Sequence, residues 1–248
     1  MHPNLKLENI RNVLIRQEET IIFALVERAQ FKQNKIIYSS AGIPIPDFDG
    51  SFVDYLLRGT EVLHATVRRY TSPEEHAFFK DLPDPVLPAE AYDYPIKKTD
   101  VNINNHIKDI YINKILTAMC VAGDDGQYGS SAICDVAALQ ALSKRIHYGK
   151  FVAESKFLSD KETYLSLIKA KDKAAIREKI TNKNVEKRLI KRVALKAATY
   201  GKEIDLTAPE QENQKQKICP QLVADIYEKW LIPLTKDVEV DYLMARGC

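Results

Sequence analysis

The segment SSAICDVAALQALSKRIHYGKFVAESKF, residues 130–157, decides the fold class of this 248-residue chain. Two cations, Arg145 and Lys156, lie eleven residues apart in it, which is roughly 16 Å along a helix. Steps of three and four residues place them on one face with small side chains: Cys134, Ala138, Ala141, Arg145, Gly149, Val152 and Lys156. The pattern predicts a helix from Ser130, as its cap, to about Phe157. Its inward face either admits a small anion between the cations or forms two interhelical salt bridges.

Similar periodicity predicts helices on both sides of this segment. An apolar stripe favours a helix over residues 5–30. Ser51 and Asp54 form a capping box for a helix through Tyr70, and Ser72 followed by Pro73 predicts another helix start. Further helices are expected over 101–119, 161–178, 183–200 with Thr181-Asn182 as the cap between the last two, and from Pro220 onward, where Pro233 interrupts or restarts the helix. Residues 81–100 and 203–217 are predicted to connect these elements. The expected architecture is an all-α, single-domain bundle.

Composition excludes several classes of protein. Lys and Arg number 36 against 34 Asp and Glu, so the net charge of +2 gives no general case for a nucleic-acid binder. The basic run KRLIKRVALK, residues 187–196, has no interleaved aromatic residues, so an RNA- or DNA-binding face is not expected. No apolar run approaches the ~18 residues of a membrane span. The four cysteines form no CxxC pair, which predicts free thiols and no zinc site.

Several polar pairs lie on one helical face. Arg11 and Glu18 are seven residues apart, and Asn182 with Glu186, Arg192 with Lys196, and Thr235 with Glu239 are each four apart. Each pair is either a solvated helix edge or part of a site. Arg68 and Arg69 end a predicted helix, where cations commonly complement the helix dipole.

Four blocks of sequence resemble the eukaryotic chorismate mutases of plants and fungi. They are IRNVLIRQEETIIFALVERAQF, DFDGSFVDYLLRGTEVLHATVRRYTSPEEH, GDDGQYGSSAICDVAALQALSKRIHYGKFVAESKF and IPLTKDVEVDYLMAR. The resemblance covers about Leu5 to Arg246, and the block SKRIHYGKFVAESKF is its most specific part. It implies an all-α homodimer, with residues 1–248 as a single domain, that converts chorismate to prephenate by a Claisen rearrangement without a cofactor or metal. That step belongs to phenylalanine and tyrosine biosynthesis.

The resemblance also implies roles for individual residues. Arg11 and Arg145 correspond to clamps for the two substrate carboxylates, and Lys156 to the cation at the ether oxygen. Glu239 corresponds to a protonated acid at the same oxygen. The remaining implied residues are Asn182 and Glu186 near the ring hydroxyl and a carboxylate, Thr235 in the pocket wall, and Glu18 as a partner that orients Arg145 or Arg192.

A regulatory site at the dimer interface is implied as well. In regulated relatives an aromatic amino acid binds there, with tryptophan activating and tyrosine inhibiting; phenylalanine is a further candidate. The corresponding residues fall near 67–69 and 126–133, namely Val67, Arg68 and Arg69, with Gly129 and Ser130. Gly126-Gln127, Ile133 and Cys219 depart from the fungal pattern, so the choice of effector stays open.

Two alternatives remain beside the enzyme: a non-catalytic helical protein that senses aromatic amino acids, and a scaffold bundle. Met1-His2-Pro3 shows no leader, so the expected compartment is the cytoplasm, or the plastid stroma if a transit peptide has been removed.

Overall fold

The computed structural model describes residues 5–90, 94–202 and 216–247, and these are built of helices. Within the described ranges, the only β-pairing is a single bridge between Lys202 and Gln216. The predicted all-α class is confirmed. No helix in these ranges combines the length and apolar character that a membrane crossing requires. Most of the connecting segment expected at 203–217 lies outside the described residues.

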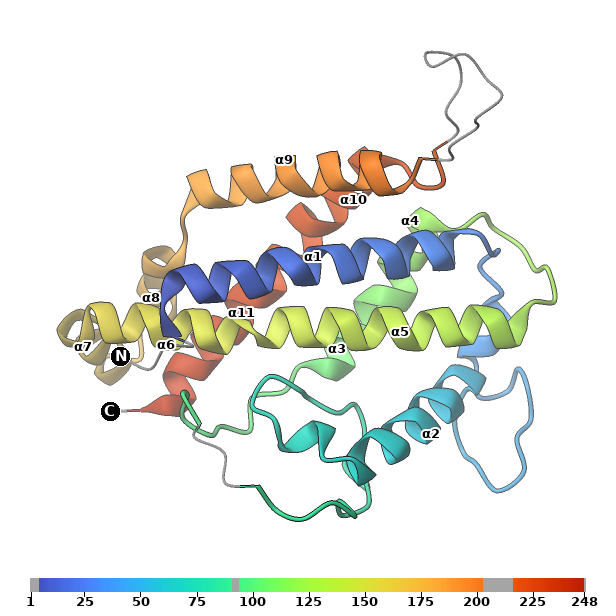
Figure 1. Ribbon diagram of the computed structural model, residues 1–248, viewed down its shortest axis with the longest axis horizontal. Coiled ribbons are helices and arrows are strands. Elements are labelled where there is room, and N and C mark those ends of the chain that lie inside the picture. The colour runs from blue at the N-terminus through green and yellow to red at the C-terminus, as the bar shows by residue number, and fades with distance from the viewer. Residues whose placement is uncertain (1–4, 91–93, 203–215, 248) are drawn as a thin grey trace.

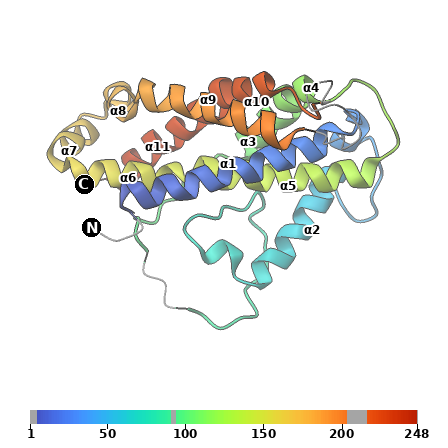
Figure 2. The same ribbon diagram turned by 45° about the horizontal axis from the view of Figure 1, so that its top comes forward.

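Long helices form the body of the bundle (Figures 1 and 2). Helix α1 (Leu7–Ala29) runs antiparallel to α5 (Tyr128–His147), and the two make the most extensive helix contact in the fold. Helix α9 (Lys183–Tyr200) lies against α1. The C-terminal helix consists of three consecutive segments. It begins as α10 (Pro220–Ile226), passes through a π-turn (Tyr227–Leu231) and ends as α11 (Ile232–Arg246).

Shorter elements complete the fold. One end of the bundle is formed by α6 (Gly149–Ser159), which follows α5 after Tyr148, and by α7 (Lys161–Lys169) and α8 (Lys173–Ile180). Helix α2 (Phe52–Thr66), the 3-10 turn η2 (Lys35–Tyr38) and α3 (Asn104–Ile110) lie on the other side of α5. Helix α3 continues through the π-turn Tyr111–Ile115 into α4 (Leu116–Met119).

Two apolar clusters hold these helices together. The first joins α1, α2, α5 and α10 around fully buried side chains such as Leu25, Leu57 and Leu139. The second joins α6, α7, α8 and α11 around side chains such as Ile176 and Tyr242. Removing such area from water is the main driving force for folding. The cavity described below borders both clusters.

The prediction that a helix starts at Ser72 is wrong. Only the 3-10 turn η3 (Arg69–Thr71) follows α2, which itself ends before the expected Tyr70. The next backbone groups are bound by a side chain instead: the N–H groups of Phe78 and Phe79 donate to the buried carboxylate of Glu61 at 2.9–3.0 Å. Tertiary hydrogen bonds satisfy these donors, so no helix is needed there.

Other helix boundaries differ from prediction as well. The helix expected from Ser130 to about Phe157 is interrupted at Tyr148, between α5 and α6. The helix expected over 161–178 is divided, because Lys171 adopts a left-handed φ of 54° and the side chain of Asp172 caps a new helix by accepting from Ala175 N–H. Ser130 is not the cap of α5, which already begins at Tyr128. The Asp125 carboxylate accepts the Gln127 N–H at 3.0 Å and so satisfies a donor just before the helix.

Candidate active site

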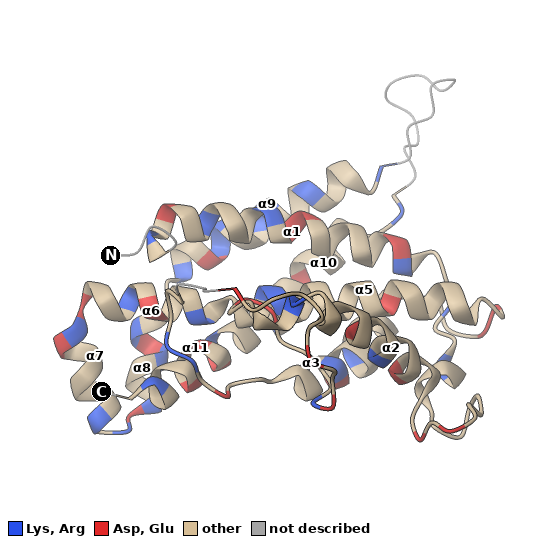
Figure 3. Ribbon diagram, turned by 60° about the horizontal axis from the view of Figure 1, so that its bottom comes forward, with Lys and Arg blue, Asp and Glu red and all other residues tan. Residues whose placement is uncertain are grey.

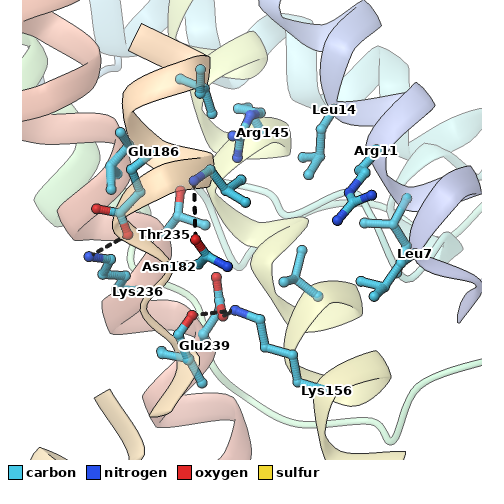
Figure 4. A pocket seen from close by; sticks show the side chains of 16 residues that line it. Leu7, Arg11, Leu14, Arg145, Lys156, Asn182, Glu186, Thr235, Lys236 and Glu239 are labelled. Carbon is cyan, nitrogen blue, oxygen red and sulfur yellow. Dashed lines mark hydrogen bonds and ion pairs between the residues drawn. The ribbon is translucent and has the colours of Figure 1, made fainter. Parts of the chain in front are cut away.

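A cavity of about 270 Å³ lies between α1, the α5–α6 unit, the start of α9, and α11 (Figure 4). Eight apolar side chains, among them Leu7, Ile10 and Val152, form much of its wall. Seven of the residues proposed from the sequence line it together: Arg11, Arg145, Lys156, Asn182, Glu186, Thr235 and Glu239. Residues that are more than 220 positions apart in sequence therefore meet in one place.

The two arginines of the cavity have unused hydrogen-bond donors. Arg145 is only 4% exposed, and its buried Nε and Nη1 have no hydrogen-bond partner among the described residues. Burial lowers the pKa of this guanidinium, because desolvation penalises the charged form. Arg11 lies exposed at the rim and has no ion pair within the described ranges. Two guanidinium groups are thus available to an anionic ligand.

Lys156 and Glu239 form an ion pair across the cavity. Their Nζ and Oε2 atoms lie 2.9 Å apart, and the same Nζ donates to the Ile180 carbonyl at 2.7 Å. Glu239 is 5% exposed, and burial raises the pKa of its carboxyl, although Lys156 and Arg145 act in the opposite direction. Burial therefore favours the protonated form of this acid, which is the form able to donate a hydrogen bond.

A second ion pair, which sequence reasoning missed, also lies in the lining of the cavity. Nζ of Lys236 is 2.7 Å from a carboxylate oxygen of Glu186. The available signal was position: Lys236 directly follows Thr235 and lies three residues before Glu239, on the same part of α11. Asn182 caps α9 by accepting from Val185 N–H at 3.2 Å, and its amide nitrogen has no partner in the described part of the chain.

The charges around the cavity are not balanced. Four cations line it, namely Arg11, Arg145, Lys156 and Lys236, against two carboxylates, Glu186 and Glu239. With both carboxylates ionised the lining carries a net charge of +2. A small molecule with two negative charges matches this excess, and the two unpartnered arginines can each bind one carboxylate in bidentate geometry.

Glu18 lies behind the cavity wall and not in it. It is fully buried and binds Arg192 through both oxygens at 2.6 and 2.9 Å, with Lys196 at 3.3 Å. Of the two arginines considered as its partner, Arg192 is the one it binds; no hydrogen bond joins it to Arg145 in the structure described.

The face of small residues predicted around the two cations serves mainly to pack helices. Ala138 is buried in the first apolar cluster, and Ala141 packs against it. A Cβ built on Gly149 would lie 3.0 Å from Thr235 Cγ2 and 3.3 Å from Glu239 Cγ. Gly149 therefore admits α11, not a ligand. Of the predicted face, only Arg145, Val152 and Lys156 line the cavity.

The residues expected to bind an effector form two separate groups within one chain. Arg69 contacts His64, Glu75 and, at 3.4 Å, Gln140 in the middle of α5. Gly129 lies eleven residues earlier on that helix, roughly 16 Å along its axis. Val67 and Arg68 follow α2, whereas Ser130 is exposed in the first turn of α5.

The fold and the cavity define an all-helical protein with a partly enclosed, cation-rich site for a small molecule. The family model of chorismate mutase type II matches residues 127–240. The chorismate mutase of Schizosaccharomyces pombe is 46% identical over 250 residues, which cover 99% of this chain and 98% of that protein. The chloroplastic chorismate mutase 1 of Arabidopsis thaliana is also 46% identical, over 98% of this chain and 75% of that protein. The chain belongs to the chorismate mutase family.

Solved structures agree with this assignment. The chorismate mutase of Candida albicans in complex with L-Trp superimposes with a TM-score of 0.91 at 41% identity, covering 98% of this chain and 92% of that one. The structure of AtCM1 with tyrosine bound in its allosteric site gives a TM-score of 0.89 at 47% identity, over 99% and 98% of the two chains.

Proposed function

We propose that this protein isomerises chorismate to prephenate in phenylalanine and tyrosine biosynthesis, with residues 1–248 acting as one catalytic domain. The observation that carries this conclusion is the pair of unpartnered guanidinium groups, Arg11 and Arg145, in a small cavity where cations outnumber carboxylates. Chorismate carries two carboxylates, one for each guanidinium group, so it matches this cavity in the sign of its charge and in hydrogen-bonding geometry.

The reaction is a Claisen rearrangement within one molecule, and it requires positioning more than chemical participation by the protein. Arg11 and Arg145 hold the carboxylates so that the two reacting ends of the substrate approach one another. Lys156 and protonated Glu239 then stabilise the negative charge that develops on the ether oxygen as its bond to carbon breaks. Apolar side chains such as Leu7 and Val152 limit the access of water. This scheme uses no cofactor.

The remaining residues shape the ends of the site. Asn182 presents its amide nitrogen, and Glu186, held by Lys236, presents a carboxylate to the ring hydroxyl of the substrate. Thr235 donates to the Leu231 carbonyl at 2.7 Å, which leaves its methyl group at the wall. Glu18 and Arg192 act as positioning residues, because their ion pair fixes α1 against α9 on the side of the cavity.

Replacing the cavity cations tests this function. We expect Arg145→Ala and Lys156→Ala each to lower kcat/KM for prephenate formation at least a hundredfold, since each removes a charged donor that stabilises the transition state. Arg58→Ala is the control, because Arg58 lies on α2, outside the cavity, where it pairs with Asp81 of the following segment. Activity within a few-fold of the parent in both cavity variants would contradict the proposed function.

We further propose a homodimer formed through α2. Tyr55, Gly59, Leu63 and Val67 follow one another at steps of four residues, so they share one face. Three of them are large apolar side chains with exposures of 47%, 69% and 56% in the single chain. Leu63→Glu should yield monomers in size-exclusion chromatography with light scattering, whereas Leu195→Glu, which alters a leucine on α9 that is 61% exposed, should not.

Aromatic amino acids are the proposed effectors, bound where two chains meet. Within one chain Val67, Arg68 and Arg69 lie far from Gly129 and Ser130, so the two groups can share a ligand only if each comes from a different chain. Free N–H groups at the start of α5 would bind the carboxylate of the amino acid. Rates measured against chorismate with tryptophan, tyrosine or phenylalanine identify the effector, and the Leu63→Glu monomer should not respond to it.

For the compartment we propose the cytoplasm, or the plastid stroma if a transit peptide has been removed. Related proteins come from a fungus and from a chloroplast. Imaging of a fluorescent C-terminal fusion in the source cells distinguishes the two compartments.

A further inference from the structure

Positive charge is concentrated in one part of the chain. Residues 161–196 contain twelve Lys or Arg and only four Asp or Glu, a net charge of +8, although the whole chain carries +2. The rest of the molecule is therefore acidic by six charges. This asymmetry is invisible in the overall composition, and it falls on α7, α8 and α9.

Only some of these cations are neutralised by ion pairs. Lys173, Arg177 and Lys179 bind aspartates, and Arg192 and Lys196 bind Glu18. Four others on α9 are exposed and have no hydrogen bond or ion pair within the described residues: Lys183, Lys187, Arg188 and Lys191. We call these four residues the α9 cationic face; Figure 3 shows the concentration of basic residues along this helix.

The arrangement of this face has a structural cost. Lys183, Lys187 and Lys191 follow one another at steps of four residues, a spacing at which like charges repel and destabilise a helix. None of the three packs against the core, so packing gives no reason for them, and only the good helix propensity of lysine offsets the repulsion. A function that depends on the charges themselves would account for their presence.

The position of α9 indicates what that function is. The first turns of the helix form one wall of the cavity through Asn182, Val185, Glu186 and Leu189. The cationic face is the outer surface of the same helix, so its field adds to that of the cavity. It also lies on the side of the bundle away from α2 (Figure 1), which leaves it open to solvent in a dimer formed through α2.

We propose that the α9 cationic face attracts the dianionic substrate to the cavity, so that substrate affinity depends on exposed charges that never touch the substrate. This inference rests on the proposed function. A field of one sign beside a cleft raises the local concentration of an oppositely charged ligand, and dissolved salt weakens the effect. A nucleic acid is a poorer fit, since residues 183–199 contain no aromatic side chain for base stacking.

A triple charge reversal, Lys183→Glu, Lys187→Glu and Lys191→Glu, tests the inference. At low ionic strength KM for chorismate should rise about three- to tenfold, a modest change because high-dielectric solvent weakens the field of exposed charges. We expect kcat to be unchanged, because these lysines do not contact the bound substrate. The difference from the parent should vanish near 0.5 M salt. The corresponding Lys→Gln triple variant should show about half of the effect on a logarithmic scale, without adding new charges.

The matched control reverses three exposed lysines elsewhere, Lys35, Lys80 and Lys114, which likewise have no ion pair among the described residues. It changes the net charge equally, and its KM and salt dependence should stay close to those of the parent.

Equal KM shifts in the α9 variant and this control overturn the inference. So does tight binding of a 20-nucleotide single-stranded RNA that only the α9 variant loses. Turnover by the parent is measured first, so a failure of the proposed function is recognised separately.

Discussion

Nζ of Lys156 lies 2.9 Å from Oε2 of Glu239, and the two residues reach this contact from different helices, α6 and α11. Burial nevertheless raises the pKa of Glu239. As the pH rises through that raised pKa, the carboxyl loses its proton and with it the ability to donate. Glu239→Gln donates without titrating, so it should stay active and should lose the fall in kcat/KM that the parent shows at high pH.

Rates between pH 5 and 9 measure this difference. Glu239→Ala, which has no donor, should be less active than the glutamine variant at every pH. A glutamine variant that is inactive throughout the range would show that the negative charge of Glu239, and not a donated hydrogen bond, is required.

Gly149 fixes the distance between α6 and α11. Because its added Cβ would lie 3.0 Å from both Cγ2 and the carbonyl oxygen of Thr235, Gly149→Ala must displace the part of α11 that carries Thr235 and Glu239. We expect the free energy of unfolding to fall by about 1–3 kcal/mol. We also expect kcat/KM to fall at least tenfold, since small displacements of catalytic groups are costly.

Helix propensity alone predicts the opposite sign for stability, because alanine favours a helix over glycine by about 1 kcal/mol. Thr235→Ser removes the methyl group that the new Cβ meets and keeps the hydroxyl. The double variant should therefore recover part of the activity lost by Gly149→Ala. Full parental activity of Gly149→Ala by itself is the result that contradicts this account.

Local chemistry in the sequence predicted several helix starts correctly. Ser51 and Asp54 form the expected capping box, Asn182 caps α9, and Pro220 occupies the first turn of α10. Each of these signals acts within three residues, so no distant contact is needed to interpret it. Pro233 was expected to interrupt or restart the last helix. The helix instead continues through a π-turn, whose wider backbone accommodates a residue without an N–H group.

Signals that depend on distant contacts were harder to interpret. The Ser72 start fails because Glu61, from another element, binds the backbone that a helix would have used. Periodicity placed Arg145 and Lys156 on one face, and the family resemblance selected the residues from other helices that meet them. Lys236 was missed because an ion pair between α9 and α11 leaves no trace in local spacing.

Two stacked histidines lie at the α5–α6 junction, and their burial predicts that stability depends on pH. The rings of His76 and His147 lie 4.2 Å apart. His147 accepts the Ile103 N–H at Nε2, and its Nδ1 lies 2.9 Å from the Ser143 carbonyl oxygen, so the neutral ring satisfies both contacts. Burial lowers the pKa of His147 to about 3 and that of His76 to about 2. Nζ of Lys150 lies 2.6 Å from Nε2 of His76. Burial lowers the pKa of Lys150 to about 8, so this amine is mainly protonated below pH 7.5, donates to the neutral ring and opposes a charge on it.

Both histidines are neutral in the folded protein but bind protons in the unfolded chain below its ordinary pKa of about 6.5. Their contribution to stability is therefore complete above pH 6.5 and is lost progressively as the pH falls below that value. We expect the free energy of unfolding to drop by about 2 kcal/mol per histidine between pH 7.5 and pH 5. Urea unfolding at fixed protein concentration measures this drop.

His147→Gln, which cannot titrate, should show a smaller drop, whereas His106→Asn, at an exposed position, should behave as the parent does. Equal stability of the parent at pH 5 and pH 7.5 would mean that these rings are already protonated in the fold, contrary to the hydrogen bonds they make.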